Sequence, residues 1–136
     1  MTHFYAGDRL VRPKQDAKMI KHHVIYVGVV NGTHQIVENQ INEGVKLTPL
    51  IEFQEKHSDY TIIRFEGSQD ERNRIVKDSL DRLGTPYKLL SYNCETFAND
   101  VQFKKRVSYQ IIGWGIGLVA FFGAVFAIRQ NSKSRN

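Results

Sequence analysis

The spacing of apolar residues in the first half of the chain predicts short strands joined by tight turns. Residues 23–30 are apolar and rich in β-branched side chains on both faces, which is typical of a central strand. Asn31-Gly32 is a strong hairpin signal, so we expect residues 34–38 to return beside that strand. Further strands are predicted within residues 7–13, 44–47 and 60–65, and a short helix within residues 49–57.

The second half of the chain predicts two main helices. Ser68 is a suitable N-cap for the first helix, and Gly84 marks its end. The apolar stripe of this helix, spaced by four and then three residues, consists of Val76, Leu80 and Leu83. Asn93 caps a second helix that runs from Cys94 to about Phe103. We therefore expect an α+β fold, with a small antiparallel sheet packed on helices.

A long apolar run follows at residues 107–128, and none of its 22 residues is Asp, Glu, Lys, Arg or His. As a helix the run would be roughly 33 Å long, enough to cross the hydrocarbon core of a bilayer. Basic residues flank it on both sides: Lys104, Lys105, Arg106, Arg129, Lys133 and Arg135. The sequence thus predicts a folded domain at residues 1–103 and a membrane anchor at residues 104–136, with a transmembrane helix at about 107–128.

The expected topology is a single-pass C-terminal tail anchor. The N-terminus lacks the apolar core of a signal peptide, so we expect residues 1–103 to lie on the cytoplasmic side of the membrane. Within the anchor, Gly113 and Gly117 match the spacing of small residues in helix dimers. A helix-mediated homodimer is therefore a candidate assembly.

The distribution of charge argues against a nucleic-acid-binding protein. The chain has 19 Lys and Arg and 14 Asp and Glu, but six of the basic residues lie in residues 104–136, which contain no acid. Residues 1–103 therefore hold 13 basic against 14 acidic residues. A nucleic-acid surface needs its positive charge on the folded domain. The single cysteine also excludes an intramolecular disulfide framework and a zinc ribbon.

That cysteine, Cys94, is placed where a nucleophile would be. In the first turn of a helix, unpaired backbone N–H groups and the helix dipole lower the pKa of a thiol. The same N–H groups can hold the oxyanion that forms when sulfur attacks a carbonyl. On position alone, however, a thiol that only packs the start of the helix is the favoured alternative.

Two histidines favour the nucleophile over the alternative in which the thiol only packs the start of the helix. His22 and His34 are twelve residues apart, an even separation that is compatible with one shared face of the predicted hairpin. One imidazole that takes the thiol proton and a second that orients it would suffice for thiol acyl transfer. A buried structural pair of histidines fits the spacing equally well. His23 faces the other side of the strand, and we expect Glu38, two pairs beyond His34, to be exposed to solvent.

Four motifs stand out when the chain is taken as a whole. They are Gly7-Asp8-x-Leu10-Val11, His22-His23-Val24-Ile25-Tyr26-Val27-Gly28, His34, and Tyr92-Asn93-Cys94-Glu95-Thr96-Phe97. Together they resemble the lecithin–retinol acyltransferase family, most closely its small phospholipase/acyltransferase branch, and the likeness covers nearly the whole chain. The sequence departs from the family pattern at His23, where relatives carry an aromatic residue, and at Thr96, which replaces a histidine.

The resemblance implies a permuted papain-like fold in which Cys94 is the nucleophile, His22 the general base and His34 the orienting residue. It implies a phospholipase A/acyltransferase that takes an acyl group from a glycerophospholipid as a thioester on Cys94 and passes it to water or an amine. The phospholipid membrane is the implied partner, and no metal or other cofactor is implied. Candidate substrate-binding residues are Tyr26, Asn93 and Glu95, although Tyr26 also fits the sheet core and Glu95 a helix-start acid.

Two other classes of protein are compatible with these residues. A permuted papain-like cysteine peptidase or isopeptidase would use the same groups, but it would need a peptide groove rather than a membrane. A non-enzymatic membrane adaptor or remodelling protein would keep the fold and use it only for binding. A zinc site made of the three residues is a weaker alternative, because no Cys-x-x-Cys or His-x3-His pair supports it.

Overall fold

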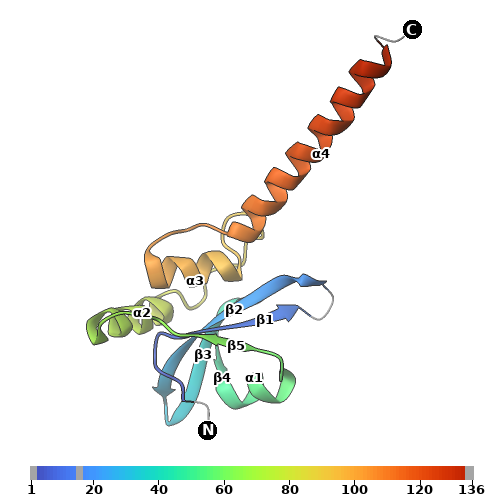
Figure 1. Cartoon of the computed structure of the whole chain (residues 1–136). Coiled ribbons are helices and arrows are strands. Elements are labelled where there is room, and N and C mark those ends of the chain that lie inside the picture. Colours follow the sequence, from blue (N-terminus) through green and yellow to red (C-terminus); the bar gives the residue numbers. More distant parts are fainter. Residues whose placement is uncertain (1–2, 15–16, 134–136) are drawn as a thin grey trace.

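A twisted antiparallel sheet forms the centre of the molecule, with helices on both of its faces (Figure 1). The computed structural model describes residues 3–14 and 17–133, without the side chains of residues 17–18, 125 and 127–133. The order of the five strands in the sheet is β4-β3-β2-β1-β5. They comprise β1 (Arg9–Lys14), β2 (Ala17–Val30), β3 (Thr33–Gln40), β4 (Gly44–Pro49) and β5 (Thr61–Ile63). The predicted α+β class with an antiparallel sheet is confirmed.

Strand β2 is longer than the sequence pattern indicates. Its apolar part begins at His23, as predicted, but the strand starts six residues earlier, at Ala17. The earlier part pairs with β1 alone as far as Ala17, since the pairing of β2 with β3 ends at Val24, opposite Glu38. From His23 back to Ala17, the edge of β2 on the side of β3 therefore has no neighbouring strand in the described part of the chain.

The helices are α1 (Leu50–Lys56), α2 (Gln69–Asp81), α3 (Cys94–Phe103) and α4 (Tyr109–Lys133). Ser68 caps α2 through a complete capping box with Glu71, as its position predicts. The buried face of α2 is centred on Ile75 and Ser79, whereas Leu83 lies beyond the end of the helix and is exposed. The predicted stripe of this helix was therefore shifted by one residue, and only Val76 and Leu80 flank the core.

Two apolar clusters lie on opposite faces of the sheet. On one face, Ile25 and Val37 pack against Ile75 of α2 and Phe97 of α3. On the other face, Val24 and its neighbours pack against α1. Both clusters include fully buried residues of β2, which explains why this strand is apolar on both sides.

The last helix, α4, extends away from the sheet (Figure 1). The membrane span expected at residues 107–128 includes Val125, Ala127 and Ile128, whose side chains lie outside the described residues. Within the part of the chain that the structure describes, no helix is long and apolar enough to cross a membrane. The expected transmembrane helix is therefore not confirmed.

Candidate active site

The N-terminus of α3 docks on the unpaired edge of β2. The Sγ atom of Cys94 lies 3.7 Å from the backbone oxygen of Lys21, and the backbone N–H of His23 hydrogen-bonds to the same sulfur. The side chain of Gln110 covers the next part of this edge: the Lys21 N–H donates to Gln110 Oε1 at 2.8 Å, and Gln110 Nε2 donates to the Lys21 oxygen at 3.3 Å. Because this edge of β2 is not paired with a strand among the described residues, the thiol of Cys94 can lie against it.

Asn93 fixes the start of α3 and with it the position of the thiol. Its Oδ1 accepts hydrogen bonds of 3.0 Å from the backbone N–H groups of Glu95 and Thr96. Its Nδ2 donates to the backbone oxygen of Leu89 at 2.9 Å. Because both sides of the amide are engaged, Asn93 acts as a buried N-cap, and Cys94 is the first residue of the helix, as predicted.

His22 brings an imidazole to the thiol, and Glu38 holds that imidazole. The ring of His22 hydrogen-bonds to Cys94, while its Nε2 lies 2.9 Å from Glu38 Oε2. Thr48 donates to the other carboxylate oxygen, Oε1, at 2.7 Å. All four residues are buried, with exposed fractions of 4% for Cys94 and 5% for His22. Because Nε2 is hydrogen-bonded to Glu38, Nδ1 is the ring nitrogen that is left for the thiol.

The electrostatics of this group shift the pKa values of the thiol and the imidazole toward each other. Burial is the strongest single influence on Cys94 and raises its pKa, but the hydrogen bond and charge of His22 and the His23 N–H together lower the pKa below its ordinary value. Burial likewise lowers the pKa of His22, but its hydrogen bonds to Cys94 and Glu38 prevail and raise the pKa above 6.5. For Glu38, the bonds from His22 and Thr48 outweigh burial, so its pKa is lowered.

The orienting role expected for His34 is wrong, because His34 lies at the other end of the hairpin. It pairs with Val29, next to the turn, seven residues along β2 from His22 and thus roughly 23 Å away. There its Nδ1 lies 2.5 Å from Tyr26 Oη. Glu38, which we expected at the surface, occupies the orienting position instead and is only 7% exposed.

One signal in the sequence and one feature of the structure explain the position of Glu38. The turn at Asn31-Gly32 comes nine residues after His22, so the residues that face His22 must lie well beyond His34. Gly28, with a φ of +88°, follows a bulge in β2 between Tyr26 and Gly28 that shifts the pairing with β3 by one residue. A one-residue shift exchanges the faces of a strand, and this one brings Glu38 to the face of His22.

The three expected substrate-binding residues have structural partners. Tyr26 is buried in the cluster under α1, where its ring lies 5.4 Å from that of Phe4. Asn93 is the N-cap described above. The carboxylate of Glu95 is buried, and its Oε2 accepts hydrogen bonds from Ser108 Oγ at 2.5 Å and from the Gln110 N–H at 3.0 Å. Glu95 therefore connects α3 to the start of α4.

His23 lies on the opposite side of β2, in a second polar group. Its Nε2 is 3.5 Å from Gln110 Nε2, whereas its buried Nδ1 has no hydrogen-bond partner among the described residues. Burial, assisted by the positive charge of Arg9, lowers the pKa of His23 to about 4. The ring is therefore neutral near pH 7.

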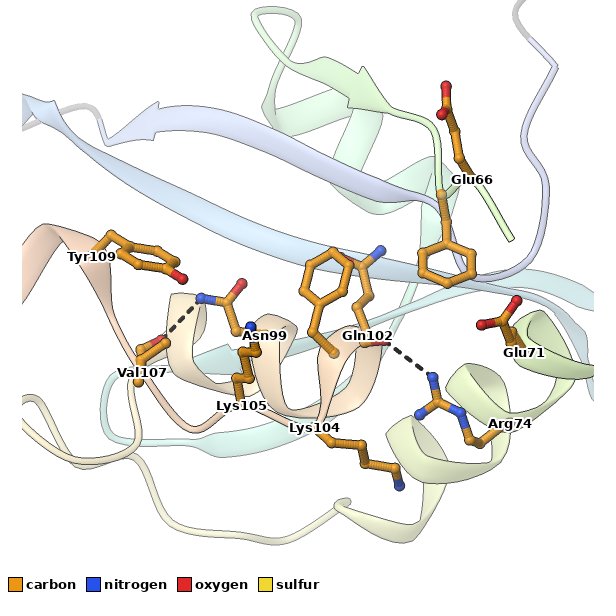
Figure 2. A pocket seen from close by; sticks show the side chains of 11 residues that line it. Glu66, Glu71, Arg74, Asn99, Gln102, Lys104, Lys105, Val107 and Tyr109 are labelled. Atoms are coloured by element: carbon orange, nitrogen blue, oxygen red, sulfur yellow. Dashed lines mark hydrogen bonds between the residues drawn. The ribbon is translucent and has the colours of Figure 1, made fainter. Parts of the chain in front are cut away.

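Two cavities lie close to the helices and strands that carry these groups. A cavity of about 270 Å³ is lined by His22 and by residues at the ends of β1 and β3. A larger hollow of about 620 Å³ lies over the C-terminal half of α3, and Figure 2 shows Arg74, Asn99 and Gln102 among its lining residues. Two of the polar side chains drawn there bond to the protein itself: Asn99 to the Val107 oxygen and Arg74 to the Gln102 oxygen. Of these two cavities, the smaller one is lined by the imidazole of His22, and Cys94 is a lining residue of neither.

Comparison with known proteins agrees with this geometry. Residues 6–103 match the model of a family described as permuted papain-like amidase enzyme, YaeF/YiiX, C92 family. No curated protein and no solved structure matches the chain. The matched range is more than half of the chain and contains Cys94, His22 and Glu38. The permuted papain-like fold and a cysteine-based enzyme are supported, whereas the lecithin–retinol acyltransferase branch is not confirmed. The chain thus belongs to the YaeF/YiiX family of permuted papain-like amidases, C92.

Proposed function

We propose that the protein is a cysteine amidase that cleaves an amide bond through an acyl-thioester on Cys94. The observation that carries this proposal is the buried line of hydrogen bonds from Cys94 through His22 to Glu38. A nucleophile, a base within hydrogen-bond reach and a third group that orients the base form the pattern of an activated thiol. The amide class comes from the family to which the chain belongs.

In the first step, the Cys94 thiolate attacks the carbonyl carbon of the amide, and the carbonyl π electrons move to oxygen. The backbone N–H of Cys94, which the Asn93 cap does not engage, is placed to stabilise that oxyanion. As the intermediate collapses, the C–N bond breaks and the leaving nitrogen takes the proton from His22. The products of this step are a free amine and an acyl-thioester on Cys94.

In the second step, His22 is neutral and accepts a proton from an attacking water molecule. The water oxygen bonds to the thioester carbon, and collapse of the second intermediate breaks the C–S bond. The carboxylic acid leaves, while the sulfur departs as a thiolate beside the newly protonated His22. Glu38 keeps Nδ1 directed at the sulfur throughout and stabilises the positive ring.

The proposal is tested by the reactivity of Cys94 and by the substrate it accepts. We expect iodoacetamide to alkylate Cys94 rapidly at pH values well below the ordinary thiol pKa, because the thiolate persists there. In a His22→Asn variant the midpoint of this profile should move up toward the ordinary thiol range. Intact mass after incubation with a panel of peptide amides and esters should show an acyl adduct, with none in Cys94→Ala. A profile that is identical in the parent and His22→Asn would refute the proposal.

A second candidate function is acyl transfer from a glycerophospholipid ester, supported by the exposed apolar side chains of α4. Trp114, Phe121 and Phe122 are each between 47% and 65% exposed, and a lipid surface would cover such side chains. In this proposal residues 104–136 hold the domain of residues 1–103 at the cytoplasmic face of a membrane, and Cys94 takes the acyl group there.

The two functions differ in substrate, so one experiment separates them. The protein is incubated with phosphatidylcholine vesicles that also contain phosphatidylethanolamine, and the lipids are profiled against a Cys94→Ser control. Lysolipid or N-acylated lipid that depends on Cys94 would favour acyl transfer. Unchanged lipids, together with cleavage of a peptide amide, would favour the amidase. Binding to vesicles without any Cys94-dependent product would instead favour a membrane adaptor.

A further inference from the structure

The smaller cavity beside His22 is built from the ends of two strands that flank β2. Arg12 and Lys14 come from the end of β1, and Asn39 and Gln40 come from the end of β3, followed by Ile41 and Asn42 of the next turn. Arg12 pairs directly with His22 across the β1–β2 ladder. A molecule in this cavity of about 270 Å³ would therefore lie next to the ring that serves the thiol.

Two of the residues that line this cavity each have a buried polar atom with no hydrogen-bond partner in the described part of the chain. One is a donor, Arg12 Nε, and the other is an acceptor, Asn39 Oδ1. Asn39 is completely buried, and its Nδ2 donates to the Tyr92 oxygen at 2.7 Å, which fixes its amide so that Oδ1 is the unpaired atom. Unpaired buried polar groups are costly, and a bound substrate that supplies the missing partners would remove that cost.

The charge of the cavity favours an anion. Arg12 and Lys14 are both basic, and the other lining residues apart from His22 are neutral. The negative groups among the described residues whose charge acts on Arg12 are Glu38, Asp59 and Cys94. The oxygens of Glu38 accept from His22 and Thr48, and Arg12 Nε has no hydrogen-bond partner among the described residues. The positive groups are therefore available to a charged ligand.

From these observations we infer that the cavity beside His22 binds a carboxylate-bearing amide, with its carboxylate on Arg12 and Lys14 and its N–H on Asn39 Oδ1. This inference rests on the proposed amidase function and names its substrate class: peptide-like amides with an acidic residue at the scissile bond. The acceptor at Asn39 distinguishes such a ligand from a simple anion, which offers no N–H or O–H donor when fully ionised.

The test uses small ligands that protect Cys94 from iodoacetamide, with intact mass as the readout. The ligands are N-acetylglutamate, its neutral diamide, its N-methylated analogue without the amide N–H, and inorganic sulfate. For each ligand the half-protecting concentration is measured with the parent, Arg12→Gln and Lys14→Gln. Lys77→Gln is the matched control, because Lys77 is an exposed base on α2 whose partner is Asp81. A half-protecting concentration is independent of any change in the intrinsic rate of alkylation.

We expect N-acetylglutamate to protect the parent and the Lys77→Gln control equally. Loss of a charge-assisted hydrogen bond should raise its half-protecting concentration about tenfold or more in Arg12→Gln and Lys14→Gln. The neutral diamide and the N-methylated analogue should both protect the parent less well. Equal protection by the diamide, no change in either variant, or no protection by any ligand would overturn the inference. Sulfate that protects as well as N-acetylglutamate would overturn the role of Asn39.

Failure of this inference is distinguishable from failure of the amidase proposal. The alkylation profile of Cys94 without ligand, and its dependence on His22, reports on the nucleophile alone. A reactive, His22-dependent thiol that no ligand protects contradicts only the inference on the cavity. A thiol whose reactivity does not depend on His22 contradicts the amidase proposal, whatever the ligands do.

Discussion

The two sides of strand β2 at His22 and His23 shift the pKa of the same kind of side chain in opposite directions. On one side, His22 contacts Cys94 and Glu38, and its pKa is raised. On the other side, His23 is nearly as buried, but burial lowers its pKa to about 4. The comparison separates the effect of burial from the effect of a direct partner, because burial disfavours the positive ring at both positions.

A carboxylate lies near each ring, so proximity of an acid does not explain the difference. Glu38 Oε2 is hydrogen-bonded to His22 at 2.9 Å. Glu95 also favours a positive His23, but its Oε2 is already bound by Ser108 and Gln110, and Arg9 opposes it. Of these two buried histidines, only the one to which an acid hydrogen-bonds directly has a raised pKa. At these two positions the hydrogen-bond partner of the imidazole, and not its burial, determines the direction in which its pKa shifts.

Exchange of each histidine for asparagine is the most severe test of this comparison. His22→Asn should lower kcat/KM for the amide substrate roughly 10³- to 10⁴-fold, because it removes the proton acceptor of the thiol. His23→Asn retains the backbone N–H that contacts Cys94, so we expect a loss below about tenfold. Steady-state kinetics on the two variants provide the measurement. Equal losses would show that the two sides of β2 do not differ in function.

The orienting position is tested next, with Glu38→Gln against His34→Gln. We expect Glu38→Gln to lower kcat roughly 10²- to 10³-fold, since the amide cannot stabilise a positive His22 as a carboxylate does. His34→Gln should leave kcat within about twofold, because His34 bonds to Tyr26 at the far end of the hairpin. A larger effect of His34→Gln than of Glu38→Gln would restore the orienting role to His34.

The neutral state of His23 has a consequence for stability in acid. Below pH 6.5 the unfolded chain binds a proton at this histidine, whereas the folded chain does not until about pH 4. The free energy of unfolding therefore falls as the pH falls through this window, by about 3 kcal/mol for this group. Between pH 7 and pH 4, the free energy of unfolding of a His23→Gln variant should fall by about 3 kcal/mol less than that of the parent, as measured by urea unfolding. Parallel losses in the two proteins would show that the ring is not held neutral.

The N-cap of α3 is expected to have a smaller effect. Asn93→Ala should lower the free energy of unfolding by about 2 kcal/mol, because two helical N–H groups and the Leu89 oxygen lose their partner in a buried site. Ser68→Ala on α2 is the matched control, since its cap lies at the surface, and should cost about 1 kcal/mol. Thermal unfolding of both variants measures the difference. A larger loss for Ser68→Ala would contradict the buried role of Asn93.

Local signals in the sequence were sufficient for most of the fold. The run Asn93-Cys94 predicted the start of α3 at its first residue, because a side-chain cap is a property of a few adjacent residues. The Asn31-Gly32 turn and the apolar run of residues 23–30 predicted the central hairpin in the same way. The extension of β2 back to Ala17 was missed, since that part contains polar residues and has only one strand as a neighbour.

The candidate site was predicted only in part, because it depends on register. Cys94 and His22 were identified from the resemblance, and the structure brings them together. Glu38 was missed because the count of twelve residues from His22 to His34 ignored where the hairpin turns. The bulge before Gly28, which puts Glu38 on the face of His22, requires the pairing of both strands and is not visible in either one alone.

Gln110 has a consequence for the solubility of the folded chain. Its side-chain amide forms one hydrogen bond to the N–H and one to the oxygen of Lys21, as the peptide group of an adjacent strand would. An unoccupied strand edge invites pairing with another molecule, and here the edge must stay open for the sulfur. The side chain of Gln110 thus occupies the backbone groups of Lys21 that a strand from another molecule would bind. Such a strand would also displace the sulfur of Cys94 from this edge.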